Sequence, residues 1–155
     1  MKRLALIVLA VALSACGAQP AAPAITPTVS GTNGPFQAQA KPGTVAAGET
    51  VHLSLIVTGP ITYEAACVQT LHIWAEDSRQ QQVWSEPVPA IACMALAYKT
   101  LAAGETATFN ADWPTSRQLA PGSYTLHGLF LTVLPPGAGM RVRENLPPLP
   151  IQVSR

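Results

Sequence analysis

The chain has 155 residues, of which 48% are hydrophobic and 11% are charged. A chain this apolar is not wholly disordered, and its length suits one domain behind a short N-terminal extension. The formal net charge of +1 includes Lys2 and Arg3 of that extension, so without them it becomes −1. Because phosphate binding needs clustered Lys and Arg, this composition excludes nucleic acid as an expected partner.

The first fifteen residues predict a lipoprotein signal peptide. Two basic residues open the chain, and the apolar run 4–13 that follows is too short for a spanning helix, which needs roughly 20 residues. The tetrapeptide Leu13-Ser14-Ala15-Cys16 resembles the bacterial lipobox, which implies cleavage after Ala15 and acylation (diacylglyceryl, palmitate) of Cys16. Several acyl chains, at ~0.8 kcal/mol per buried CH₂, would anchor the chain stably. An ordinary secretory signal is the alternative.

Residues 17–35, GAQPAAPAITPTVSGTNGP, are uncharged and rich in Ala, Pro, Gly, Thr and Ser. They show no sustained apolar period and bury too little surface to offset the entropy of ordering. As a coil they would reach about 25 Å. We therefore divide the chain into a removed signal peptide (1–15), a lipidated cysteine with a flexible tether (16–35), and a folded domain (36–155).

The domain alternates apolar and polar residues in short segments, as half-buried strands do. The predicted elements are a strand at 36–40, a strand at 51–57, a hairpin within 68–86, strands at 107–113 and 124–133, and a strand at 149–153. The last has prolines at positions 147, 148 and 150, before and within it, which places it at a sheet edge or makes it begin late. About seven strands and no amphipathic helix predict an all-β, immunoglobulin-like antiparallel β-sandwich.

Two local motifs support this architecture. The heptapeptide TVAAGET at 44–50 recurs as TLAAGET at 100–106, while the flanking sequence does not repeat. We interpret this as one turn chemistry used twice rather than a duplicated unit. Tyr124 follows the turn Leu119-Ala120-Pro121-Gly122, as does the tyrosine that pins an immunoglobulin-like corner to nearby backbone.

Several motifs between Gly43 and Leu131 resemble the intracellular proteinase inhibitor (BsuPI) family. They are Ile73-Trp74-Ala75, Val83-Trp84, Leu101-Ala102-Ala103-Gly104-Glu105, Trp113, and Pro121-Gly122-Ser123-Tyr124-Thr125-Leu126. The resemblance implies an immunoglobulin-like sandwich and, by the family's name, inhibition of a serine protease. For an exported chain, the corresponding target would be an exported protease.

Cys67 and Cys93 are the thiols that remain once Cys16 is acylated. An even pair in an exported domain favours a disulfide, which would close a loop of about 27 residues and contribute roughly 3–4 kcal/mol. Metal ligation and redox chemistry are the alternatives, but the spacing is not CxxC and no histidine lies close in sequence.

The remaining candidates for chemistry are few. The histidines at 52, 72 and 127 have no diagnostic ligand spacing, so we expect no metal and no cofactor. No catalytic motif is present, and we expect no enzyme activity. Trp113 is predicted to lie in the core, and Trp74 is the better candidate for an exposed aromatic on a carbohydrate- or peptide-binding face.

The candidate interaction loop comprises Leu134, Pro135, Pro136, Gly137 and Met140, because its prolines stiffen an exposed segment bounded by apolar residues. An ordinary strand connection is the alternative. We therefore expect a lipoprotein of the bacterial cell envelope, extracytoplasmic and held on a membrane through Cys16, whose domain is a non-catalytic binding or scaffolding module for a protein partner. A proteinase inhibitor of the BsuPI type is the second hypothesis, and a small-ligand or metal carrier is the third.

Overall fold

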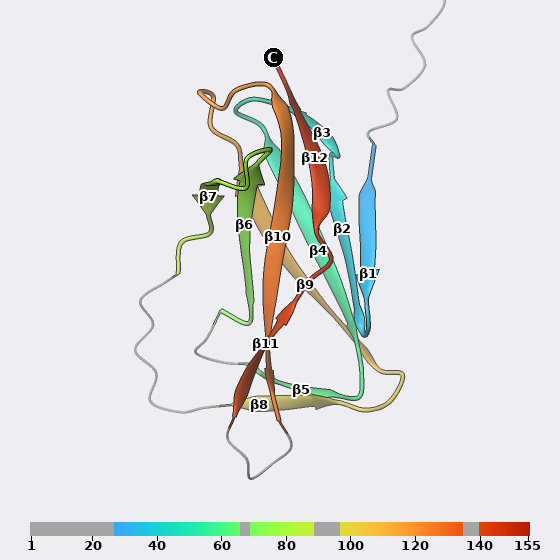
Figure 1. Ribbon diagram of the computed structural model, residues 1–155. Coiled ribbons are helices and arrows are strands. Elements are labelled where there is room, and N and C mark those ends of the chain that lie inside the picture. Colours follow the sequence, from blue (N-terminus) through green and yellow to red (C-terminus); the bar gives the residue numbers. More distant parts are fainter. Residues whose placement is uncertain (1–26, 66–68, 89–96, 135–139) are drawn as a thin grey trace, which may run out of the picture.

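The computed structural model describes residues 27–65, 69–88, 97–134 and 140–155, and in these ranges every regular element is a β-strand. The strands form two sheets that pack face to face (Figure 1). The all-β sandwich predicted from the alternating pattern is thereby confirmed. Within the described residues there is no helix that could span a membrane.

The smaller sheet has four antiparallel strands in the order β1-β2-β4-β9. Their bounds are Val29–Asn33 for β1, Phe36–Lys41 for β2, Thr50–Thr58 for β4 and Thr106–Pro114 for β9.

The larger sheet is built around β10 (Gly122–Val133), which runs the length of the molecule (Figure 1). Four strands pair with β10: β5 (Ile61–Glu64), β6 (Leu71–Asp77), β11 (Arg141–Asn145) and β12 (Leu149–Ser154). The outer strands are β3 (Thr44–Ala46), β7 (Gln82–Ser85) and β8 (Tyr98–Leu101). All these pairs are antiparallel except β3–β12, which is parallel and departs from the predicted antiparallel pattern.

The core forms where the inward faces of the two sheets meet. Side chains alternate in and out along a strand, so Leu126 and Phe130 of β10 point inward with Ile73 of β6. The ring of Phe130 lies 4.9 Å from Phe109 and 5.5 Å from Phe36, centroid to centroid. Such tilted aromatic pairs add about 0.5–1.5 kcal/mol each beyond the area that they bury.

A second aromatic group fills the other end of the core. Trp113 is only 1% exposed, which confirms its predicted core position. Its ring centroid lies 6.0 Å from that of Tyr124 and 6.5 Å from that of Trp84. Tyr124 also donates a hydrogen bond of 2.7 Å from its hydroxyl to the carbonyl of Ala120, so the predicted tyrosine corner is confirmed. Burial, and to a lesser extent the charge of Asp77, raises the pKa of the Tyr124 hydroxyl.

The repeated heptapeptide forms the same turn twice. Each glycine has a positive φ, 97° at Gly48 and 82° at Gly104. The glutamate that follows accepts a hydrogen bond from the backbone N–H three residues earlier, over 3.1 Å for Glu49 and 2.7 Å for Glu105. Both turns carry the chain from the larger sheet to the smaller one, and they lie at opposite ends of the β4–β9 pair. The prediction of one turn chemistry used twice is confirmed.

Two predictions about the extent of the strands are wrong. The structure has twelve strands in its described residues rather than about seven. The sheet begins at Val29, so the predicted tether (16–35) extends too far and the domain starts before residue 36. The strand β12 pairs with β10 along most of its length but with β3 only over Gln152–Ser154, so the stretch that contains Pro150 is uncovered on the β3 side, as the prediction of an edge or a late start requires.

The strands that the sequence pattern did not predict share one property, which is that they are short. β1, β3, β5, β8 and β11 have between three and five residues, too few to show a period. β1 is held by backbone pairing with β2 and by the turn at Gly34, where φ is 56°. Pairing of this kind uses only N–H and C=O groups, so it leaves little trace in the side chains.

Candidate binding site at the β10–β11 end

The described ends of the candidate interaction loop, Leu134 and Met140, directly follow β10 and directly precede β11, and these two strands reach the bottom of Figure 1. At its base, the N–H of Leu134 donates to the carbonyl of Met140 over 3.0 Å, directly beyond the last strand pair, Val133 with Arg141. The side chains of Leu134 and Met140 are 41% and 59% exposed. Pro135, Pro136 and Gly137 lie outside the described residues.

An ion pair fixes the same hairpin to β5. Nη2 of Arg141 lies 2.8 Å from Oε2 of Glu64, whose side chain is almost completely buried, whereas that of Arg141 is half exposed. No well-aligned hydrogen bond from a described residue reaches either carboxylate oxygen, so the guanidinium charge is the compensation for the buried carboxylate. The base of the loop is therefore held from two directions.

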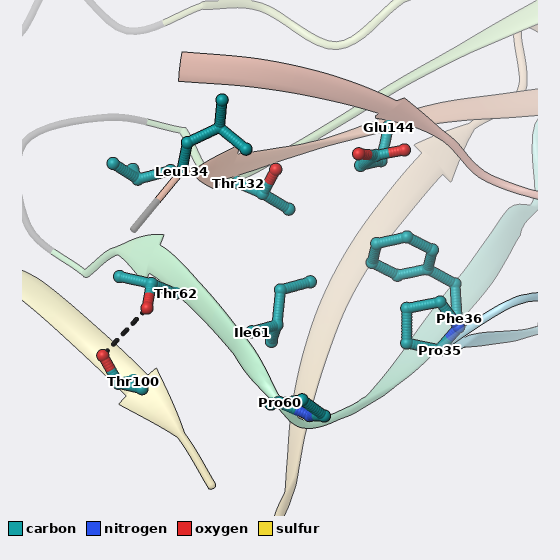
Figure 2. Close-up of a pocket in the computed structure, with 10 residues that line it drawn as sticks. Pro35, Phe36, Pro60, Ile61, Thr62, Thr100, Thr132, Leu134 and Glu144 are labelled. Carbon is teal, nitrogen blue, oxygen red and sulfur yellow. Dashed lines mark hydrogen bonds between the residues drawn. The ribbon is translucent and has the colours of Figure 1, made fainter. Parts of the chain in front are cut away.

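A hollow of about 510 Å³ opens beside this base (Figure 2). Its walls are contributed by Pro35, Phe36, Pro60, Ile61, Thr62, Thr100, Thr132, Val133, Leu134 and Glu144. The hydroxyls of Thr62 and Thr100 lie 2.9 Å apart and satisfy each other across the β5–β8 pair. Among the described residues of this lining, Glu144 is the one ionisable group, so these residues offer no acid–base pair for catalysis. The hollow suits an apolar group.

The predicted aromatic candidate lies elsewhere, on the outer face of the larger sheet. Trp74 is half buried there, and the rings of two histidines stack against it, His127 at 5.3 Å and His72 at 6.3 Å between centroids. The third, His52, lies on the smaller sheet and contacts Asp112 through Nδ1 over 2.8 Å in solvent. Across the described residues, no three potential ligands gather in a group that could hold a metal ion.

Glu86 is a partly buried carboxyl group directly after β7. Burial raises its pKa, and the hydrogen bond of 3.3 Å that it accepts from the Ile73 backbone N–H opposes the increase. It lines a hollow between β7 and β9 with Trp84 and Asp112, whose charge also raises the pKa of Glu86.

The three cysteines, Cys16, Cys67 and Cys93, lie outside the described residues. The described neighbours of the second and third are close together, since the N–H of Ala65 donates to the carbonyl of Ala97 over 2.8 Å. The disulfide stays a prediction.

Part of the chain matches a known protein family. Residues 58–134 match the model of the BsuPI family, described as intracellular proteinase inhibitor. The matched segment runs from the end of β4 to Leu134, where the candidate loop begins. The resemblance predicted from the sequence is confirmed over this segment. By its description the family is one of inhibitors, which are not catalysts. A search of curated protein sequences finds no match.

Among solved structures, the C-terminal domain of wzt aligns with a TM-score of 0.52 at 13% identity, covering 77% of this chain and 71% of that one. This likeness shows a shared fold. A Niemann-Pick type C2 protein from the Japanese carpenter ant aligns with a TM-score of 0.39 at 10% identity, covering 72% and 79% of the two chains. That score is too low to bear on the fold.

Proposed function

We propose that the protein is a non-catalytic binding module that recognises a protein partner with the β10–β11 end of its sandwich, and the match of residues 58–134 to the BsuPI-family model supports this. The observation that carries the proposal is the exposure of Leu134 and Met140 on a base that is already fixed. Exposed apolar side chains on a rigid base lose little conformational entropy on binding. The flexible thioether of Met140 can adapt to an irregular partner surface.

The hollow beside the loop defines the chemistry of the partner. Its walls are mainly apolar, and Leu134 belongs both to the hollow and to the loop base. A buried anchor residue in a pocket, surrounded by exposed contacts, is the usual source of binding energy at protein interfaces. The partner would insert a Leu-, Met- or Phe-sized side chain into the hollow while Leu134 and Met140 contact its surface.

The proposed lipid anchor on Cys16 would leave the β10–β11 end of the sandwich free to bind a partner. The start of β1 lies at the end of the sandwich opposite the end of the β10–β11 hairpin (Figure 1). A lipid on Cys16 and a tether that ends before Val29 would therefore present the binding end away from the membrane surface. The hydrogen bond from Tyr124 to Ala120 supports the immunoglobulin-like assignment within this proposal.

Photo-crosslinking in the envelope tests the binding proposal. A crosslinking residue at Met140 should trap a partner, whereas one at Val83 should not. Val83 is a matched control because it is a large apolar residue on β7 that is 40% exposed. Equal trapping at both positions, or none at Met140 from correctly exported protein, would refute a binding site at the β10–β11 end.

The second candidate function is inhibition of an exported serine protease, and the family match favours it. The loop would fill the protease cleft from its fixed base. Titration of subtilisin-like and chymotrypsin-like proteases with the purified protein should then give stoichiometric inhibition, with the chain itself left uncut. Met140→Asp should abolish the inhibition and Val83→Asp should not. A folded protein that inhibits none of the proteases would leave the binding module as the remaining proposal.

A further inference from the structure

A second hollow, of about 380 Å³, lies on the outer face of the larger sheet. It is lined by Gln69, His72, Val88, Leu129, Leu131 and Arg143. The alternation along β10 turns Leu129 and Leu131 outward, because Phe130 between them points into the core. Leu129 pairs with His72 of β6, and Leu131 pairs with Arg143 of β11. The strands β6, β10 and β11 thus form a hollow whose base is apolar and whose sides carry polar groups.

Two atoms in this lining have unused hydrogen-bonding capacity. Oε1 of Gln69 and Nδ1 of His72 are shielded from water, and no described residue bonds to either. The other ring nitrogen of His72 lies 3.2 Å from the hydroxyl of Ser85. A buried polar atom without a partner costs about 1–3 kcal/mol. A ligand with hydroxyl groups would serve both atoms, since a hydroxyl can donate to Gln69 and either donate to or accept from His72.

Arg143 adds a positive charge at the edge of the hollow. Its side chain is exposed, and none of the described acidic groups lies within ion-pair distance of it. A guanidinium presents a planar fork of N–H donors that fits a carboxylate through two hydrogen bonds. The hollow therefore favours a ligand that carries an acidic group as well as hydroxyls.

Next to the hollow lies a rigid aromatic platform. The ring of Trp74 is nearly parallel to that of His127, with an angle of 11° between their planes. Glu76 holds both, because it accepts a hydrogen bond of 2.8 Å from Nε1 of Trp74 and lies 3.3 Å from Nε2 of His127. His72 joins the platform to the hollow, since it stacks on Trp74 and also lines the hollow. Because the rings stack on one another, the group offers ring edges and the faces that the stacking leaves free, and the C–H groups of a sugar can pack against these.

We propose that this outer face of β6, β10 and β11 binds an acidic saccharide. One sugar unit occupies the hollow, with its carboxylate on Arg143, its hydroxyls on Gln69 and His72, and its C–H face on Leu129 and Leu131. The next unit of the chain lies along the platform of Trp74 and His127. This site is separate from the proposed partner site at Leu134 and Met140, so each proposal stands or falls alone.

Isothermal titration calorimetry of the full chain in detergent tests the proposal with three ligands: trigalacturonate, neutral maltotriose and the peptide triglutamate. We expect trigalacturonate to bind at least about tenfold more tightly than maltotriose, because the neutral sugar lacks the contact with Arg143. Arg143→Gln should weaken the binding of trigalacturonate by about tenfold. Arg79→Gln is the matched control, since Arg79 is exposed in the β6–β7 turn, and it should change nothing.

A second variant, Gln69→Leu, removes the unsatisfied amide oxygen, together with the hydrogen bond of this side chain to Glu86, and fills the same space with apolar atoms; it too should weaken trigalacturonate binding. The proposal is overturned if trigalacturonate does not bind, or if it binds equally well to Arg143→Gln and Gln69→Leu. Equal affinity for maltotriose would overturn the role of the acidic group. Equal affinity for triglutamate would show that the face recognises carboxylates of peptides, which also overturns a saccharide site.

Discussion

Replacement of Arg141 by alanine should destabilise the domain by leaving Glu64 without its cation. Removal of one partner from a fully buried ion pair costs about 3–5 kcal/mol, because the remaining charge stays out of water. Here Glu64 is 2% exposed but the Arg141 side chain is 49% exposed, so solvent already screens part of the attraction. We therefore expect a loss of about 2 kcal/mol in the free energy of unfolding, which corresponds to a decrease of roughly 7 °C in Tm.

Urea and thermal unfolding followed by circular dichroism would measure this loss. Arg143→Ala is a suitable control, because Arg143 is an exposed arginine on the same strand and no ion pair joins it to another described residue. Its substitution should change stability by no more than about 0.5 kcal/mol. The double variant Arg141→Ala with Glu64→Gln should lose less than the sum of the single losses, because the two residues are in contact. Equal effects of Arg141→Ala and Arg143→Ala would refute the argument that this ion pair holds β11 on β5.

Three further predictions follow from single contacts. Tyr124→Phe should lower stability by about 1–2 kcal/mol, because it removes the bond to Ala120 and keeps the ring; an unchanged urea midpoint would argue against the tyrosine corner. Gly59→Ala should cost at least about 2 kcal/mol, since a Cβ there would lie 2.1 Å from the carbonyl oxygen of Ala102, and thermal unfolding would show it. Burial raises the pKa of Glu86, so this carboxyl's contribution to stability is present at low pH and lost as the pH rises through its folded pKa. The Tm of Glu86→Gln should therefore rise relative to the Tm of the parent protein as the pH increases from 4 to 7. A difference in Tm that stays constant over this range would contradict the argument.

Local features of the sequence predicted much of the fold. Alternation placed Ile73 and Ala75 on the buried face of β6, and both are completely buried. Tyr124 and the glutamates of the two repeated turns act on backbone groups a few residues away, so the motif alone carries their geometry. The burial pattern, the tyrosine corner and the repeated turn could be predicted because the groups involved lie within one turn or one strand of each other; the glutamate contacts were found only in the structure.

The candidate sites depend on residues that only the tertiary structure brings together. The sequence marked Leu134 and Met140 as the ends of a loop, but Glu64 and Arg141 meet because β5 crosses the end of the β10–β11 hairpin. Trp74 was predicted to be an exposed aromatic, yet its contact with His127 requires the register of β6 on β10.

Side-chain periodicity determines which face of a strand is buried, and this property can be predicted from the sequence alone. It does not determine which strand lies beside which, or in what register, because those choices are made by backbone hydrogen bonds and by how two sheets fit together. The hollows, the ion pair of Arg141 and the platform at Trp74 all arise at such junctions. They are consequences of tertiary packing, and the physical reason is that each combines side chains from strands that are distant in the sequence.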